Sequence, residues 1–121
     1  MVLRDTGEKK QYNEDYILQA IEEESQAMLE RLMGQADKWF KGLVSKAGTM
    51  EELGKKLKKG GFVRVNFCSR DADGEACADK IGEEFQAEVR GTLHGKTEKP
   101  EGKCIVCGKK AKEVMYVAKA Y

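Results

Sequence analysis

The sequence predicts an α+β fold, α/β-like in its second half, with a long N-terminal helical arm ahead of a small module that contains a βαβ unit and a C-terminal strand. Apolar residues recur every three or four positions over residues 13–48, as on one face of a helix. Two stretches of alternating polarity, 62–67 and 87–93, flank a second helical pattern. Four cysteines lie in the same half of the chain. Because four thiolates complete a tetrahedral zinc site, we expect a zinc-stapled module, meaning one whose segments the ion ties together.

The composition limits the class of protein. The 121 residues suffice for one domain, or for a small domain with an appendage. Charged residues make up 36% of the chain and the net charge is only +1, so the chain lacks a global basic footprint for nucleic acid. The sequence contains no run of about 18 apolar residues, so no membrane span is predicted. The N-terminus lacks the apolar stretch of a signal peptide, so we expect a cytoplasmic protein whose cysteines stay reduced.

The helical arm is predicted from its end signals and its apolar repeat. Asn13 is suited to the N-cap, and Gly48 ends the pattern, so we expect a helix of about nine turns. Gly34 and Gly42 lie inside this helix and weaken it. A second, short helix begins at the capping box Thr49-Met50-Glu51-Glu52 and ends at Gly60.

The module is predicted from alternation of period two. Residues 62–67 form a strand with Val63, Val65 and Phe67 on one face, and this strand leads into Cys68. A helix through Cys77, Ile81 and Phe85 follows, and then a strand over 87–93. A helix between two strands predicts a right-handed βαβ unit. The last strand is predicted over 113–121, with one face formed by Val114, Tyr116, Ala118 and Ala120.

The four cysteines are the strongest chemical signal. Cys104 and Cys107 lie in Lys103-Cys104-Ile105-Val106-Cys107-Gly108, the pattern of a zinc knuckle, in which a tight turn presents two thiolates to one ion. Cys68 and Cys77, with eight residues between them, complete the set of ligands. Four protein ligands leave no open position for a substrate, so the ion is expected to be structural.

Other interpretations of the cysteines stay open from the residues alone. They are disulfides, buried apolar cysteines, and a redox pair at Cys104 and Cys107. The redox pair is disfavoured because such a pair normally opens a helix beside a strand, whereas this one lies between a glycine-rich loop and a strand.

Several other residues are candidate sites. Lysines cluster over 55–59 and over 96–112, and the second segment contains six lysines and two glutamates. Such runs usually form a solvated surface, and weak contact with RNA phosphates is the alternative. His94 is interpreted as a solvated side chain. The acidic residues over 71–75 are interpreted as helix caps, because the rest of a calcium loop is absent. Tyr121 ends the last predicted strand, which favours a docked terminus.

The motifs together resemble a known family. They are Gly61–Val65, Phe67-Cys68, Cys77–Ile81, Ala87–Thr92, Gly102–Lys109 and Tyr116–Tyr121. In sequence they are similar to the C-terminal zinc-binding domain of prolyl-tRNA synthetases of the archaeal and eukaryotic type, class II ligases. Arg4–Lys9 resembles the exit from that family's anticodon-binding domain.

The resemblance implies a fragment of proline–tRNA ligase that is not catalytic by itself. Residues 1–11 would end the anticodon-binding domain, 12–60 would form a helical connector, and 61–121 would form the zinc-binding α/β domain. The ligands would be Cys68, Cys77, Cys104 and Cys107, and Tyr121 would reach back toward the active site. ATP and Mg²⁺ would bind only in a catalytic domain upstream.

The resemblance also implies partners. They are the upstream domains of the same chain, tRNA(Pro), with weak contact at most by the fragment, and a second copy in a homodimer. The rival hypothesis is a free-standing zinc module that binds RNA or protein through its lysines, and a third is a thiol oxidoreductase.

Overall fold

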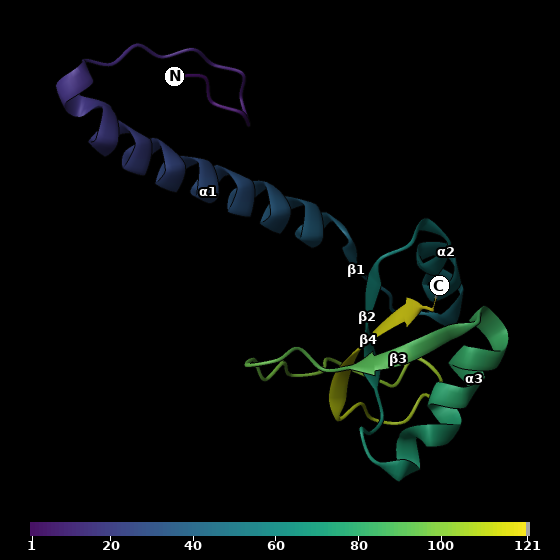
Figure 1. Cartoon of the computed structure of the whole chain (residues 1–121). Helices are drawn as coiled ribbons and strands as arrows, with labels where there is room; N and C mark the ends of the chain where they lie inside the picture. The colour runs from purple at the N-terminus through teal and green to yellow at the C-terminus, as the bar shows by residue number, and fades with distance from the viewer. Residues whose placement is uncertain (121) are drawn as a thin grey trace. The chain divides into compact units, whose positions relative to one another are not determined.

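The computed structural model describes residues 1–120 and divides into two compact units, Met1–Gly42 and a second that begins at Leu43. The elements follow in the order η1, α1, β1, α2, β2, η2, α3, β3 and β4 (Figure 1). Within the described part of the chain, no helix combines the length and apolar character that crossing a membrane requires.

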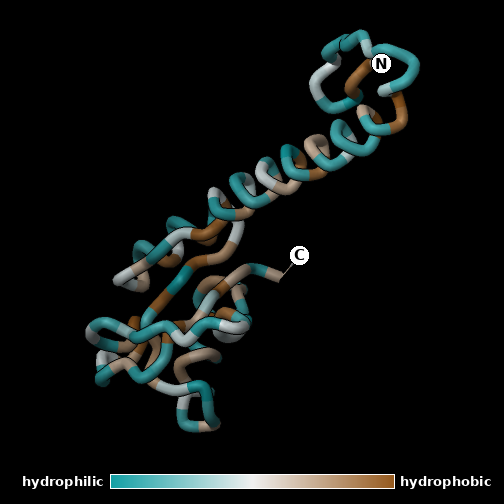
Figure 2. Tube along the Cα trace, turned by 90° about the vertical axis from the view of Figure 1, so that its left-hand side faces the viewer, coloured by the Kyte–Doolittle hydropathy of each residue, from teal (hydrophilic) through white to brown (hydrophobic). Residues whose placement is uncertain are grey.

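The first unit is one long helix with the N-terminal segment folded back along it. A short 3-10 turn, η1 (Glu14–Tyr16), leads into α1 (Ile17–Gly42). Asn13 occupies the N-cap position, as predicted, with an extended backbone but no side-chain capping bond. Polar and apolar residues alternate along α1 at the helical repeat (Figure 2).

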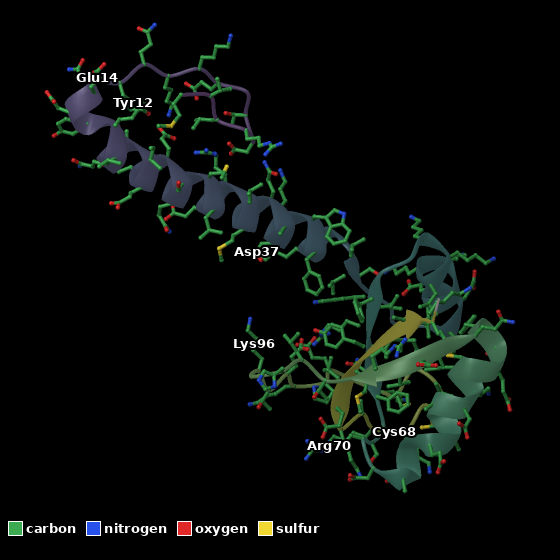
Figure 3. All side chains as sticks on the ribbon, in the orientation of Figure 1. Tyr12, Glu14, Asp37, Cys68, Arg70 and Lys96 are labelled. Atoms are coloured by element: carbon green, nitrogen blue, oxygen red, sulfur yellow. The ribbon has the colours of Figure 1, made fainter. Side chains whose placement is uncertain are left out.

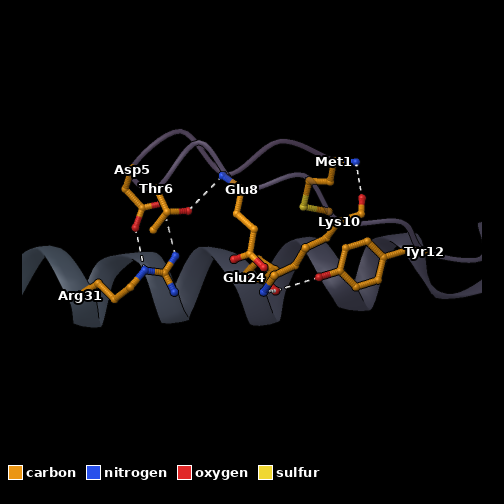
Figure 4. Close-up of polar contacts among 8 residues, drawn as sticks. All are labelled: Met1, Asp5, Thr6, Glu8, Lys10, Tyr12, Glu24 and Arg31. Carbon is orange, nitrogen blue, oxygen red and sulfur yellow. Dashed lines mark hydrogen bonds and ion pairs between the residues drawn. The ribbon is translucent and has the colours of Figure 1, made fainter.

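The N-terminal segment is a small hairpin that packs on α1. The backbone nitrogen of Leu3 donates to the carbonyl of Glu8 at 2.9 Å, and Leu3 is buried. Arg31 donates to Asp5 at 2.6 Å, from Nε to Oδ2. The same segment contacts Glu24 of α1, which accepts from the Lys10 ammonium at 2.6 Å and the Tyr12 hydroxyl at 2.7 Å (Figure 4).

The prediction of a helix continuing to Gly48 is wrong. The helix ends at Gly42, and the next residues form a short strand, β1 (Val44–Lys46), that pairs in parallel with β2. Three residues are too short to show alternation, and Leu43 continues the apolar helical repeat, so the sequence pattern hides this strand.

The second unit is a four-stranded mixed sheet in the order β1-β2-β4-β3. Helix α2 (Met50–Lys59) connects β1 to β2 (Phe62–Phe67), and α3 (Glu75–Phe85) connects β2 to β3 (Ala87–Gly91) after the turn η2 (Ala72–Gly74). Strand β4 (Glu113–Lys119) pairs antiparallel with both β2 and β3. The βαβ unit of β2, α3 and β3 is therefore present, but β4 lies between its two strands.

One face of this sheet carries the core. Val63, Val65 and Phe67 are fully buried on it, as the alternation predicts, and Met115 and Val117 continue this face on β4. Both helices cover it, because Leu53 and Leu57 of α2 and Ile81 of α3 belong to the same apolar cluster. Thr49 caps α2 as predicted, its hydroxyl accepting from the Glu52 nitrogen at 3.2 Å.

The other face of the sheet is crossed by residues 92–101, which we call the strap. Glu98 accepts from the Arg64 guanidinium and from the Tyr116 hydroxyl, each at 2.7 Å. Asn66 donates from Nδ2 to the Glu101 carbonyl. The predicted face of Val114, Tyr116 and Ala118 is thus the strap side of the sheet. Strand β3 ends at Gly91, where the pairing with β4 is irregular, so the predicted strand over 87–93 is shorter in the structure.

Candidate metal centre

Two of the four cysteines are placed by the β2–α3 connection. Cys68 directly follows β2 (Figure 3). Cys77 lies in the first turn of α3. The intervening loop is held by buried Ser69, whose hydroxyl accepts from the Asp71 nitrogen at 3.1 Å. The backbone nitrogen of Gly74 then donates to the Asp71 carbonyl at 2.8 Å. The loop therefore reverses the chain and brings Cys77 back to Cys68.

Gly74 is needed in this reversal because the space beside it is already occupied. A Cβ atom at this position would collide with the carbonyl of Ser69 and approach the Phe67 ring at 3.3 Å. The backbone of Gly74 itself is unstrained, with φ −91°. Close packing thus excludes a side chain here, whereas the sequence offers Gly74 only as one glycine in a polar loop.

The other two cysteines lie in a hairpin over residues 102–111, which we call the knuckle hairpin. Lys103 and Lys110 face each other in an antiparallel bridge, and the Cys104 nitrogen donates to the Lys109 carbonyl at 2.7 Å. The turn closes with a bond of 3.1 Å from the Gly108 nitrogen to the Cys104 carbonyl. Gly108 has φ +69°, a conformation that glycine adopts at little cost.

Backbone hydrogen bonds dock this hairpin at the end of β2. The Ile105 nitrogen donates to the Asn66 carbonyl, and the Lys112 nitrogen donates to the Phe67 carbonyl, both at 3.0 Å. These two bonds join the hairpin to the last two residues of β2, immediately before Cys68. They place Cys104 and Cys107 beside the first pair, although 26 residues lie between Cys77 and Cys104 in the chain.

The four sulfur atoms have the spacing of a metal site. All lie within 4.8 Å of one another, and the Cys68 and Cys77 sulfurs are 3.7 Å apart. A tetrahedron with zinc–sulfur bonds of about 2.3 Å has edges of about 3.8 Å, close to that value. A disulfide needs about 2.0 Å between sulfurs, and all four cysteines are free thiols. The set therefore fits a tetrahedral thiophilic ion such as Zn²⁺.

Without an ion, the surroundings of the cluster shift the pKa values of Cys68, Cys77 and Cys107. Burial raises the pKa of the Cys77 thiol to about 12, and the neighbouring Cys68 and Cys107 add to the rise. Burial likewise raises the pKa of Cys68. The exposed Cys107 behaves differently: a hydrogen bond from the Lys109 backbone lowers its pKa to about 7. A divalent cation would supply the positive charge that allows four neighbouring thiols to ionise together.

The other candidate residues lie outside this cluster. His94 is exposed on the strap, so no nitrogen ligand joins the sulfurs. Among the described residues, the four cysteines are the one group of three or more metal-ligating side chains, and the acidic residues over 71–75 form no calcium site. Asp73 instead bonds Ser69, which lowers the pKa of its carboxyl. Tyr121 lies outside the described residues.

Sequence reasoning missed the parts that assemble the cluster. Ser69 and Gly74 shape the loop, and the carbonyls of Asn66 and Phe67 dock the hairpin. The docking bonds come from the backbone, so no residue type could have revealed them. The exclusion of a side chain at Gly74 depends on the tertiary position of Ser69.

Comparisons with known proteins agree on one family. Residues 50–121 match the family model described as "Prolyl-tRNA synthetase, C-terminal". Proline–tRNA ligase from Thermofilum pendens is 32% identical over 119 residues, which cover 98% of this chain and 24% of that protein. The bacterial enzyme from Oceanobacillus iheyensis is 30% identical over 125 residues, again covering 24% of its length.

Solved structures extend the agreement to the fold. The prolyl-tRNA synthetase of Giardia lamblia, solved in complex with prolyl-adenylate, superimposes with a TM-score of 0.75 at 31% identity, over 84% of this chain and 21% of that one. The prolyl-tRNA synthetase of Cryptosporidium parvum gives a TM-score of 0.82 over 99% of this chain and 25% of that one. At 21% identity, this second structure supports the fold alone. The chain thus spans about a quarter of the length of these relatives.

Proposed function

Since the chain belongs to the family of prolyl-tRNA synthetase C-terminal domains, we propose that it is the zinc-stabilised C-terminal part of a proline–tRNA ligase. The observation that carries the zinc assignment is the set of four cysteine sulfurs within 4.8 Å of one another. Four protein ligands fill a tetrahedron, so the ion would be structural and would not bind substrate.

The catalytic work of the enzyme is assigned to other parts of a longer chain. The full enzyme would ligate proline to tRNA(Pro) with ATP and Mg²⁺ bound upstream, would be cytoplasmic and would form a homodimer. Residues 1–11 would end the anticodon-binding domain, 12–60 would connect it to the zinc-binding domain, and 61–121 would form that domain. The relatives support the placement of this chain within a longer protein, since it corresponds to about a quarter of each.

The exposed face of α1 supports the role of a connector within a larger enzyme. Leu18, Leu32 and Trp39, spaced by multiples of seven, are 76%, 45% and 69% exposed. Further large apolar side chains of this helix are exposed as well, namely Ile17, Ile21, Leu29, Met33 and Phe40. A soluble monomer seldom exposes a contiguous apolar patch beyond a few hundred Å². Upstream domains of the same chain would cover this face.

The rival functions are less well supported. If the chain were a free-standing zinc module, there would be no reason for nearly its whole length to match one quarter of a longer ligase. A thiol oxidoreductase would use two of the cysteines as a pair, whereas all four gather into one cluster.

The terminal tyrosine provides the test of this function. We expect deletion of Tyr121 from the full-length enzyme to lower the rate of proline transfer to tRNA(Pro) by tenfold or more, on the order of 1.4 kcal/mol of transition-state stabilisation. The measurements are aminoacylation kinetics and the melting temperature. The melting temperature should stay within about 2 °C of the wild type, because the deletion leaves the buried core residues of the described chain in place.

Two results would contradict the proposal. A wild-type enzyme that does not charge tRNA(Pro) would overturn the assignment as a ligase. Unchanged charging after deletion of Tyr121 would overturn the docked terminus and leave the ligase in place. Replacement of Tyr121 by phenylalanine is the matched variant, because it keeps the α-carboxylate and removes only the phenolic hydroxyl.

A further inference from the structure

The strap and the knuckle hairpin carry a group of cations that the zinc site does not use. It comprises Lys96, Lys99, Lys103, Lys109, Lys110 and Lys112, and all six side chains are exposed. In the described part of the chain none of the six makes an ion pair or a side-chain hydrogen bond. We call these six residues the lysine surface.

The hairpin places two of these charges against each other. Lys103 and Lys110 are directly opposite in the antiparallel bridge, so their side chains share one face of the hairpin. Like charges opposite each other in a β pair destabilise it. Lys109 and Lys112 lie close enough to Asp73 to lower the pKa of its carboxyl, so this carboxylate offsets one of their charges.

Nearby acidic groups do not neutralise the lysine surface. The Glu98 carboxylate is occupied by Arg64 and Tyr116, which leaves Glu101 as the exposed acidic residue between Lys96 and Lys112. A zinc ion with four thiolates would contribute a charge of −2. After these contributions and that of the Asp73 carboxylate, an excess of about two positive charges remains on a small surface.

The backbone that carries the lysines is fixed. Glu98 ties the strap to β2 and β4 through side chains, and Asn66 bonds the Glu101 carbonyl just before the hairpin begins. The hairpin itself is docked on the end of β2. Binding at this surface therefore needs to order only lysine side chains, and not the loops that bear them.

We propose that the lysine surface contacts the phosphate backbone of the tRNA, an inference that rests on the function proposed above. Lysine ammonium groups are point charges that suit phosphates, and they position a nucleic acid without reading its bases. The aromatic residue Tyr116 contacts the strap through its hydroxyl, which donates to Glu98, and it does not offer a stacking surface. The contact is therefore independent of sequence, sensitive to salt and additional to anticodon recognition.

The experiment neutralises the bridged pair in the full-length enzyme, as Lys103→Gln together with Lys110→Gln. Glutamine is chosen because a new carboxylate would also repel the thiolate cluster. We expect the KM for tRNA to rise roughly tenfold, and the slope of log affinity against log salt, from titration of labelled tRNA, to fall by about two. Proline-dependent ATP–pyrophosphate exchange and the zinc content should not change, since neither involves tRNA.

Two further variants make the outcome decisive. Lys58→Gln with Lys59→Gln removes the same charge from exposed positions on α2 and should leave the tRNA KM unchanged. Lys96→Gln with Lys99→Gln tests the strap independently, in case the hairpin variant loses zinc. Unchanged tRNA affinity and salt slope in both strap and hairpin variants would overturn the proposal, even where exchange is normal. Absence of proline-dependent exchange in the wild type would instead overturn the ligase assignment, and direct tRNA titration would still test the surface.

Discussion

Replacing Cys104 by alanine is expected to release the metal and abolish cooperative unfolding of the second unit. The Cys104 side chain is 3% exposed, and its backbone holds the turn of the knuckle hairpin. Structural zinc contributes on the order of 10 kcal/mol to the folding of small domains. A core of this size supplies only about 3–5 kcal/mol by itself, so the loss of the ion exceeds what the core can offset.

The measurement combines zinc content with thermal unfolding followed by circular dichroism. His94→Ala is the matched control, because it removes a potential ligand outside the cluster and should keep one zinc per chain and the wild-type melting temperature. A Cys104→Ala variant that melts like the wild type would show that the metal has no structural role.

Truncation of Phe67 to alanine is expected to cost about 3–5 kcal/mol of unfolding free energy. The ring is 2% exposed in the core beneath the sheet, and it also lies next to Gly74 in the loop between Cys68 and Cys77. The cavity should therefore destabilise the sheet and loosen the cysteine cluster together. Zinc affinity should fall as well, because metal binding is coupled to folding.

The measurement is urea unfolding of the zinc-loaded chain, with zinc affinity from competition with a chelator. Tyr16→Ala is the control, because it also removes an aromatic ring, at a side chain that is 61% exposed in the first unit. Its expected cost is below about 1 kcal/mol. Equal destabilisation by the two truncations would contradict the placement of Phe67 at the centre of the core.

The sequence predicts the parts of this structure that depend on residues close together in the chain. It does not predict the parts that depend on pairing between distant segments. Local signals were sufficient for α2, whose Thr49 cap and glycine stop are formed by neighbours in the chain. They were also sufficient for β2, whose buried face has a period of two. The insertion of β4 between β2 and β3 could not be predicted, because strand order depends on pairing between distant segments. Strand β1 was missed because a three-residue strand leaves no periodic signal.

The candidate site shows the same division. The residue types and the knuckle spacing pointed to Cys68, Cys77, Cys104 and Cys107, and the structure brings their sulfurs together. The means of bringing them together were not visible in the residue types, because the hairpin docks through backbone groups of Asn66 and Phe67. The strap was also hidden, since Glu98 in a lysine-rich loop does not reveal its partners Arg64 and Tyr116 across the sheet.

Native mass spectrometry of the chain tests the central claim most directly, namely that one ion holds the sulfurs of three separate segments. The account predicts a mass with one zinc ion bound per chain, and cysteines that react with an alkylating reagent only after a chelator has removed the metal. A metal-free mass short of four hydrogen atoms, which would mean two disulfides, would contradict it. A metal-free chain with four reactive thiols and an unchanged fold would contradict it equally.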